Sequence, residues 1–277
     1  RYLPRRQIVR NQQRLEAMVR QRLGGMGERK PGRVLPKSKK RGFPEFRTEW
    51  INTQPTLWNV ERFARDEGGA RVCLYGPPGA GKTAYAQELA KRLGKPFILQ
   101  SSSDLLGMYV GQTEKNIAEM FDKAERAGAV LLLDEADTFL YSRNIAQRSW
   151  EVSAINEFMV RLERFDGVFL ATTNRFNSFD KAILRRLQMK VEFGYLNVDQ
   201  VRAILAECVV DKVLANGLTQ SQLEHLNHLT PGIIRAAVES LELRGFRPRT
   251  EKLLSALERE QEAQTECVAG RSIGFIQ

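Results

Sequence analysis

Apolar residues in the middle of the chain form short runs separated by longer amphipathic patterns. The runs predict strands at residues 72–75, 97–100, 130–133, 168–172 and 190–193. The patterns between these runs predict helices at residues 84–93, 113–127, 150–165 and 180–186. Because strands that alternate with helices pair in parallel and are covered on both faces, we expect an α/β domain with a parallel five-stranded sheet.

The pattern changes after residue 196, where apolar residues recur only at helical spacing. Helices are predicted at residues 198–209, 219–228, 232–243 and 250–262, separated by turn-forming Gly, Pro and Asn residues. We therefore divide the chain into four parts: an N-terminal arm (1–48), the α/β domain (49–196), a small all-helical domain (197–262) and a C-terminal tail (263–277).

The N-terminal arm carries the positive charge of the chain. Residues 1–48 hold 15 of the 43 Lys and Arg residues but 3 of the 33 Asp and Glu residues, a net charge of +12. The rest holds 28 basic and 30 acidic residues, a net charge of −2. Such an arm is suited to nucleic acid, an acidic partner or anionic lipid, and a solvated linker has the same composition.

Ordered structure is expected to resume near Phe43, after a Gly-, Pro- and Lys-rich connection. Trp50, Leu57 and Trp58 are the expected packing residues. Aromatic residues among basic ones can stack on nucleotide bases. Packing onto the domain that follows is the interpretation we favour.

The composition argues against several other classes of protein. No apolar run approaches the roughly 18 residues needed to span a bilayer, and no signal-peptide pattern is present. Cys73, Cys208 and Cys267 are scattered, which argues against a disulfide framework and suits a reducing cytoplasm. His225 and His228 are expected on a solvated helix face, and a zinc site is not expected. Because the chain does not begin with Met, we interpret it as a fragment or a processed product.

A glycine-rich stretch between the first predicted strand and the helix after it indicates phosphate binding. Glycines let several backbone N–H groups point at one anion, and the helix N-terminus adds positive potential. We expect Lys82 to reach the β- and γ-phosphates of ATP and the Thr83 hydroxyl to bind Mg²⁺. The alternative is an ordinary Gly-Pro turn. The residues of the stretch are Gly76, Pro77, Pro78, Gly79, Ala80, Gly81, Lys82 and Thr83, with Ala84 opening the helix.

Two acids follow the apolar run at 130–133. Asp134 would lie beside the phosphate loop, at the carboxyl end of a central strand, and hold Mg²⁺. Glu135 is suited to act as the base that activates an attacking water. A strand that leads into an acidic turn is the alternative, and the distance of about 50 residues from the phosphate loop favours the catalytic interpretation.

Another apolar strand ends in Thr172, Thr173 and Asn174. The neutral amide of Asn174 could position the attacking water or contact the γ-phosphate. An Asn-capped turn is the alternative.

These motifs together resemble the AAA+ ATPases, in the branch that includes spastin, katanin, the membrane AAA proteases and the proteasomal ATPases. The matching segments are Gly-Pro-Pro-Gly-Ala-Gly-Lys-Thr, Leu-Leu-Leu-Asp-Glu-Ala-Asp, Ala-Thr-Thr-Asn-Arg and Phe-Asp-Lys-Ala-Ile-Leu-Arg-Arg. The resemblance covers about residues 50–262. In detail, this part of the chain is similar to single-module bacterial AAA ATPases with an attached N-terminal region. It implies a P-loop α/β core followed by a helical lid.

The resemblance also implies roles for residues that carry little signal alone. Arg185 and Arg186 fall where the branch has arginine fingers, which reach the γ-phosphate bound by a neighbouring subunit and imply a homo-oligomeric ring, normally a hexamer. The family has Phe where this chain has Leu187. A helix-end Arg pair is otherwise a solvated or dipole-capping feature.

Two further segments match the branch in part. Met108, Tyr109 and Val110 match its pore loop, so Tyr109 would grip an extended protein substrate in a central channel, although a loop tyrosine often only packs. Arg235 lies where relatives place a sensor arginine of the lid, but Ile replaces the usual preceding acid and many branch members lack this arginine. A surface charge is the alternative for Arg235.

The sequence therefore predicts a cytoplasmic ATP-hydrolysing ring motor that remodels or unfolds a protein. Two alternatives remain. One is a DNA-associated ATPase, such as an initiator, loader or transposition regulator, that uses the basic arm. The other is an ATP-gated assembly scaffold with negligible turnover.

Overall fold

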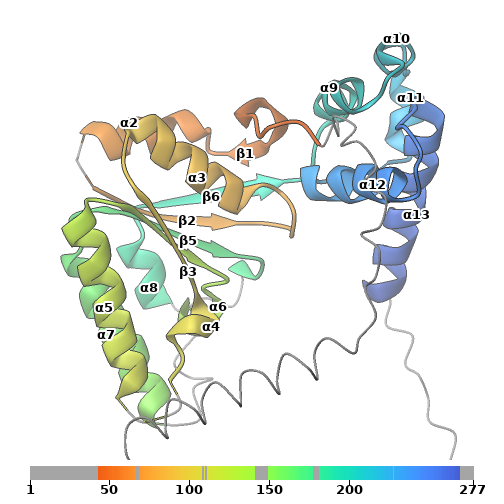
Figure 1. The fold of residues 1–277 in the computed structure, drawn as a ribbon. Coiled ribbons are helices and arrows are strands. Elements are labelled where there is room, and N and C mark those ends of the chain that lie inside the picture. Colours follow the sequence, from red (N-terminus) through yellow and green to blue (C-terminus); the bar gives the residue numbers. More distant parts are fainter. Residues whose placement is uncertain are drawn as a thin grey trace, which may run out of the picture. The chain divides into compact units, whose positions relative to one another are not determined.

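A computed structural model describes residues 43–66, 69–107, 109, 111–140, 149–176, 181–226 and 228–268 of the chain. The expectations for the arm before Phe43, for Met108, for Val110 and for the tail after Val268 lie outside these residues. The described chain contains a sheet with helices on both faces, followed by a group of helices (Figure 1).

The sheet has six strands in the order β1-β6-β2-β5-β4-β3. All five predicted strands are present and parallel to one another: β2 (Ala70–Tyr75), β3 (Phe97–Ser101), β4 (Val130–Asp134), β5 (Val168–Thr173) and β6 (Met189–Gly194). The sixth, β1 (Asn52–Gln54), pairs antiparallel with β6 and was not predicted. Its three polar residues give no apolar run, so only its backbone pairing identifies it as a strand.

Alternate residues of the strands face two separate cores. Leu131 and Leu133 of β4 pack with helices α5 (Gln112–Ala127), α6 (Asp137–Leu140), α7 (Ser149–Arg164) and α8 (Lys181–Arg186) on one face. Val130 and Leu132 pack with α2 (Leu57–Asp66) and α3 (Lys82–Leu93) on the other. Because both faces are covered, β4 is apolar at every position before Asp134, as the sequence pattern indicated.

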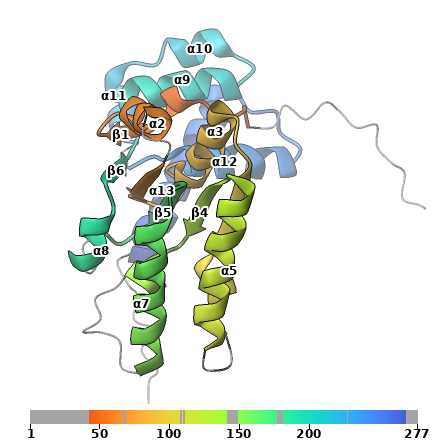
Figure 2. The same cartoon turned by 90° about the vertical axis from the view of Figure 1, so that its left-hand side faces the viewer.

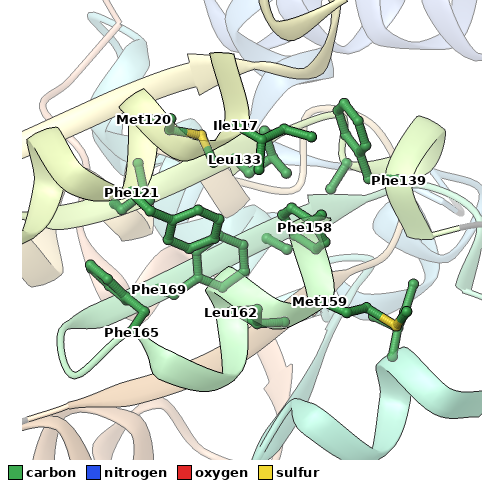
Figure 3. Packing of buried hydrophobic residues seen from close by; sticks show 14 of the residues in the cluster. Ile117, Met120, Phe121, Leu133, Phe139, Phe158, Met159, Leu162, Phe165 and Phe169 are labelled. Carbon is green, nitrogen blue, oxygen red and sulfur yellow. The ribbon is translucent and has the colours of Figure 1, made fainter. Parts of the chain in front are cut away.

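Phenylalanine side chains from several elements meet in the first of these cores (Figure 3). The rings of Phe121, Phe158 and Phe169 lie with centroids 5.8–5.9 Å apart. The first comes from α5, the second from α7 and the third from β5, so the cluster fastens these two helices to the sheet. Helices α5 and α7 lie side by side (Figure 2).

The described chain beyond β6 is helical, as predicted, although one of its helices, α10, was not predicted. It comprises α9 (Val198–Cys208), α10 (Lys212–Asn216), α11 (Gln220–Glu224), α12 (Pro231–Leu243) and α13 (Thr250–Val268). Thr230 caps α12, and Pro231 occupies its first turn, where a missing N–H costs nothing. Trp50, in a short 3₁₀ helix η1 (Thr48–Trp50), packs into the core of these helices. The packing expected for Trp50 is therefore confirmed.

Two local expectations were wrong. Trp58 is 65% exposed on α2 and is not a packing residue. His225 and His228 are both exposed, as expected, but they do not share a helix face, because α11 ends at Glu224. His228 adopts φ = 62° and its ring lies 4.7 Å from that of Tyr195, a tertiary contact that the spacing of the two histidines could not reveal.

Candidate active site

A cavity of about 340 Å³ opens beside the carboxyl ends of β2, β4 and β5. Ligands of open parallel sheets bind at this edge, where loops from neighbouring strands converge. Its lining also includes residues of α12 and of the segment before β1. The described lining residues are Phe43, Phe46, Trp50, Ile51, Pro78–Ala84, Asp134, Glu135, Thr172–Asn174, Pro231, Gly232 and Arg235.

The glycine-rich loop joins β2 to α3 as the sequence predicts. Gly76 has φ = 139°, and a Cβ built there would lie 2.0 Å from the Phe193 carbonyl oxygen. Gly79 and Gly81 also have positive φ values, of 75° and 97°. The loop therefore requires glycine for both space and conformation. It leaves the N-terminus of the twelve-residue helix α3 at the cavity, an arrangement suited to a phosphate.

Lys82 is buried beneath this loop, only 8% exposed. Its Nζ donates hydrogen bonds to the carbonyl oxygens of Gly76 (2.8 Å) and Pro77 (2.9 Å) and to Asn174 Oδ1 (2.8 Å). Burial lowers the pKa of Lys82 from 10.5 to about 8, against the opposing effect of the nearby Asp134 and Asp137 carboxylates. An anion bound here would favour the charged ammonium.

The residues suited to a magnesium ion lie next to Lys82. Thr83 Oγ1 is 3.3 Å from both carboxylate oxygens of Asp134. A hydroxyl and a carboxylate are hard oxygen donors, the type that Mg²⁺ prefers, and the adjacent phosphate loop would supply the remaining oxygen ligands through ATP. The donor set therefore fits the ion, with Thr83 and Asp134 as the protein residues that would hold it.

Glu135 follows Asp134 in a left-handed turn with φ = 52°. Its N–H donates to Thr172 Oγ1 (3.1 Å), and its exposed side chain lines the cavity. The structure thus brings Lys82, Asp134, Glu135 and Asn174 together in one cavity, although they come from three separate elements and lie up to 92 residues apart.

Arg235 of α12 also lines the cavity, on the side of the helical domain. Its guanidinium carbon lies 4.9 Å from the centroid of the Phe43 ring. Phe43 and Phe46 were expected to be ordered but not to line the cavity. In the sequence, these two aromatic residues near the end of the basic arm were equally consistent with ordinary packing onto the domain that follows.

Arg185 and Arg186 are not among the described residues that line the cavity. Both lie in the last turn of α8, where Arg185 is exposed. Arg186 Nε forms an ion pair with Glu163 Oε1 at 2.7 Å, and its Nη1 donates to the Ala182 carbonyl oxygen at 2.9 Å. The structure therefore separates the two arginines from the cavity of their own chain.

Tyr109 lies between α4 (Ser102–Leu105) and α5 and is 77% exposed. Its neighbours Met108 and Val110 lie outside the described residues. No helix in the described part of the chain is long and apolar enough to cross a membrane.

Comparison with known proteins agrees with this geometry. The family model described as "ATPase family associated with various cellular activities (AAA)" matches residues 72–195. The ATP-dependent zinc metalloprotease FtsH of Streptococcus pneumoniae is 30% identical over 214 residues, covering 72% of this chain and 32% of the relative. FtsH 3 of Sphaerobacter thermophilus is 33% identical over 211 residues, covering 72% of this chain and 42% of the relative.

A cell division cycle protein 48 homolog from Archaeoglobus fulgidus is 30% identical over 177 residues, covering 61% of this chain and 24% of the relative. The matches with these three proteins thus span only about a quarter to two fifths of their lengths.

Proposed function

Because residues 72–195 form a domain of the AAA ATPase family, we propose that this chain hydrolyses ATP as a subunit of a ring, most simply a hexamer, that remodels or unfolds a protein. The observation that carries the proposal is that the arginines lie apart from the cavity that holds the other charged groups of the site. One cavity holds Lys82, Asp134, Glu135 and Asn174, while Arg185 and Arg186 lie elsewhere on the chain.

Within the cavity, the loop amides and Lys82 bind the phosphates of ATP. Lys82 Nζ exchanges backbone carbonyl partners for phosphate oxygens, which compensate better for the burial of its charge. Mg²⁺ held by Thr83 and Asp134 would neutralise part of the charge on the β- and γ-phosphates. Glu135 accepts the proton of the attacking water, and the Asn174 amide orients the γ-phosphate.

The arginines complete the site of the adjacent subunit. The planar guanidinium of each arginine stabilises the charge that develops on the transferred phosphoryl group. Arg185, which is exposed, is free to reach across a subunit boundary. Arg186 would have to leave Glu163 or carry the ion pair into the interface.

The exposed position of Tyr109 supports a protein substrate. A tyrosine that is 77% exposed in the isolated chain contributes little to the core, so its aromatic ring is available to grip a polypeptide without regard to sequence. We propose that Tyr109 lies in the central channel of the ring. Movement of the helical domain during the ATP cycle would move Tyr109.

The proposal is tested with Glu135→Gln. The amide keeps the size of the side chain but cannot accept the proton, so turnover should fall by about 10²–10⁴-fold while ATP still binds and promotes assembly. Glu125→Gln, at an exposed position on α5, is the matched control. Turnover by Glu135→Gln equal to that of the control would overturn the hydrolytic mechanism.

The charge of residues 1–48 favours a second candidate function, DNA association. Counterion release would make such binding steeply dependent on salt. The deletion that tests it must end at residue 42, because Phe43, Phe46 and Trp50 line the cavity. DNA affinity that falls with salt and disappears with the deletion would support this candidate over protein remodelling. A chain that binds ATP and assembles without turnover would instead be a scaffold.

A further inference from the structure

Three successive residues at the end of β5 form hydrogen bonds with groups on the neighbouring segments of the chain. Thr172 bonds to Asp134 and Glu135, Thr173 bonds to Asp137 Oδ1, and Asn174 accepts a hydrogen bond from Lys82. Strand β5 lies between β2, which leads into the phosphate loop, and β4, which leads into the acidic pair. It is therefore placed to set the orientation of both.

Thr172 makes the largest number of these contacts. Its side chain is 2% exposed, and its hydroxyl donates to Asp134 Oδ1 while accepting the N–H of Glu135 at 3.1 Å. Its carbonyl oxygen also accepts the N–H of Ala136 at 2.9 Å. A single residue thus fixes one carboxylate oxygen of Asp134 and the backbone on both sides of Glu135.

These contacts matter because Glu135 adopts a conformation that non-glycine residues rarely hold. At φ = 52° its peptide N–H points towards β5, and the Thr172 hydroxyl is the acceptor that satisfies it. The turn determines the direction in which the exposed Glu135 side chain leaves the strand. Asp134 in turn has its oxygens shared between Thr172 and Thr83, so its carboxylate is held in one orientation.

We propose that Thr172 is a positioning residue that orients Asp134 towards Mg²⁺ and Glu135 towards the attacking water. The inference rests on the proposed hydrolytic roles of Asp134 and Glu135. A purely structural role for Thr172 is the competing explanation, because a β-branched residue suits a buried strand. Valine has the same shape, so a structural role predicts that valine serves equally well.

The test compares Thr172→Val, which removes the hydroxyl, with Thr172→Ser, which keeps it. Partners that orient metal-binding carboxylates typically contribute about 10–100-fold to metal affinity or activity. Thr172→Val should therefore lower kcat by about that factor and raise the Mg²⁺ concentration needed for half-maximal rate, whereas Thr172→Ser should retain most of both. Thr172→Ala removes the hydroxyl with a smaller side chain and serves if the valine variant does not fold.

Measuring nucleotide binding tests the role of the Thr172 hydroxyl independently of ATP turnover. Affinity for a fluorescent ATP analogue is measured in EDTA and in Mg²⁺ for the same variants. We expect equal affinities in EDTA, because the phosphate loop is intact, and a smaller gain on adding Mg²⁺ for Thr172→Val and Thr172→Ala than for wild type and Thr172→Ser. A hydroxyl-free variant with wild-type kcat and wild-type Mg²⁺ dependence would overturn the inference.

Different results would contradict the positioning role of Thr172 and the hydrolytic mechanism. If wild type turns over ATP and Glu135→Gln does not, but the hydroxyl-free Thr172 variants match wild type, the positioning role alone is wrong. If Glu135→Gln also matches wild type, the proposed hydrolytic mechanism is wrong.

Discussion

The N–H of Gly232, at the start of α12, donates a hydrogen bond to the carbonyl oxygen of Gly79, in the phosphate loop, at 2.9 Å. The two backbones are in direct contact: a Cβ built on Gly232 would lie 2.7 Å from Gly79 Cα. The helical domain therefore touches the phosphate loop itself. This contact provides a route by which ligand in the cavity can change the position of α12.

Gly232→Ala should weaken nucleotide binding. The added methyl group must push α12 away from Gly79, and overpacking of this kind typically costs about 1–3 kcal/mol. We expect a rise in the Kd for ATP of corresponding size, measured by fluorescence titration. Gly217→Ala is the matched control in the same domain, because its Cβ would meet no described atom closer than 3.5 Å. Equal affinities for the two variants would show that the contact does not influence binding.

ATP binding should take up a proton through Lys82 at alkaline pH. Burial lowers the pKa of Lys82 to about 8, below its ordinary value of 10.5, so the ammonium is partly deprotonated in the free protein above pH 8. Bound phosphates favour the charged form and raise this pKa, so binding between about pH 8 and 10 must be accompanied by protonation. At pH 7 Lys82 is mostly charged in the free protein as well, so it contributes little uptake.

Calorimetry at pH 9 and pH 7, in buffers of different ionisation enthalpy, measures this uptake with Mg²⁺ and a non-hydrolysable ATP analogue. A proton uptake that is much larger at pH 9 than at pH 7 is the expected result. Equal uptake at both values would assign the proton to another group.

The contact between Phe43 and Arg235 should contribute to nucleotide affinity. The ring and the guanidinium restrain each other at the edge of the cavity, and exposed cation–π pairs contribute about 0.5–1 kcal/mol. Phe43→Ala and Arg235→Ala should each lower ATP affinity a few-fold. If they act through the same contact, the double variant should lose less than the sum of the two effects.

Lys252→Ala provides the control for that comparison. Lys252 Nζ lies 3.7 Å from the Phe246 ring centroid, which makes a second cation–π pair in the same domain. Neither residue is among the described lining of the cavity. Lys252→Ala should therefore leave ATP affinity unchanged. Strict additivity of the Phe43 and Arg235 substitutions would contradict the coupling.

Tyr109→Ala should uncouple ATP turnover from work on a protein. The side chain is exposed and is not among the described residues that line the cavity, so ATP binding and basal turnover should stay near wild type. Unfolding of a model protein fused to an unstructured tail should be lost. Trp58→Ala, which removes an aromatic ring that is 65% exposed on α2, is the control. Equal unfolding by both variants would exclude Tyr109 as the gripping residue.

Most of the framework was predictable because its signal is local. The strands β2, β4 and β5 are apolar runs, and the chemistry at the end of each is carried by adjacent residues such as Asp134 and Glu135. Strand β1 was not predictable, because its only signature is pairing with β6, about 140 residues away. The predicted position of the phosphate loop at a helix N-terminus is confirmed.

The contacts that complete the site depend on tertiary packing. Phe43 meets Arg235 only because the segment before β1 packs against the helical domain. In the sequence, Thr172 has no feature that distinguishes it from other strand residues. In the structure, its hydroxyl bonds to both Asp134 and Glu135. In the same way, the ion pair of Arg186 with Glu163 joins α8 to α7 and has no counterpart in sequence spacing.

The central claim, that two subunits share each catalytic site, is tested most directly by mixing two defective chains. Lys82→Ala lacks the phosphate contact, and a chain with both Arg185→Ala and Arg186→Ala lacks the arginines, so each alone should be nearly inactive. In mixed rings at equal ratio, about a quarter of the boundaries join an intact cavity to intact arginines, and the ATPase rate should recover to about that fraction of wild type. If mixing restores no activity, or if the chain without Arg185 and Arg186 is fully active alone, the shared site is contradicted.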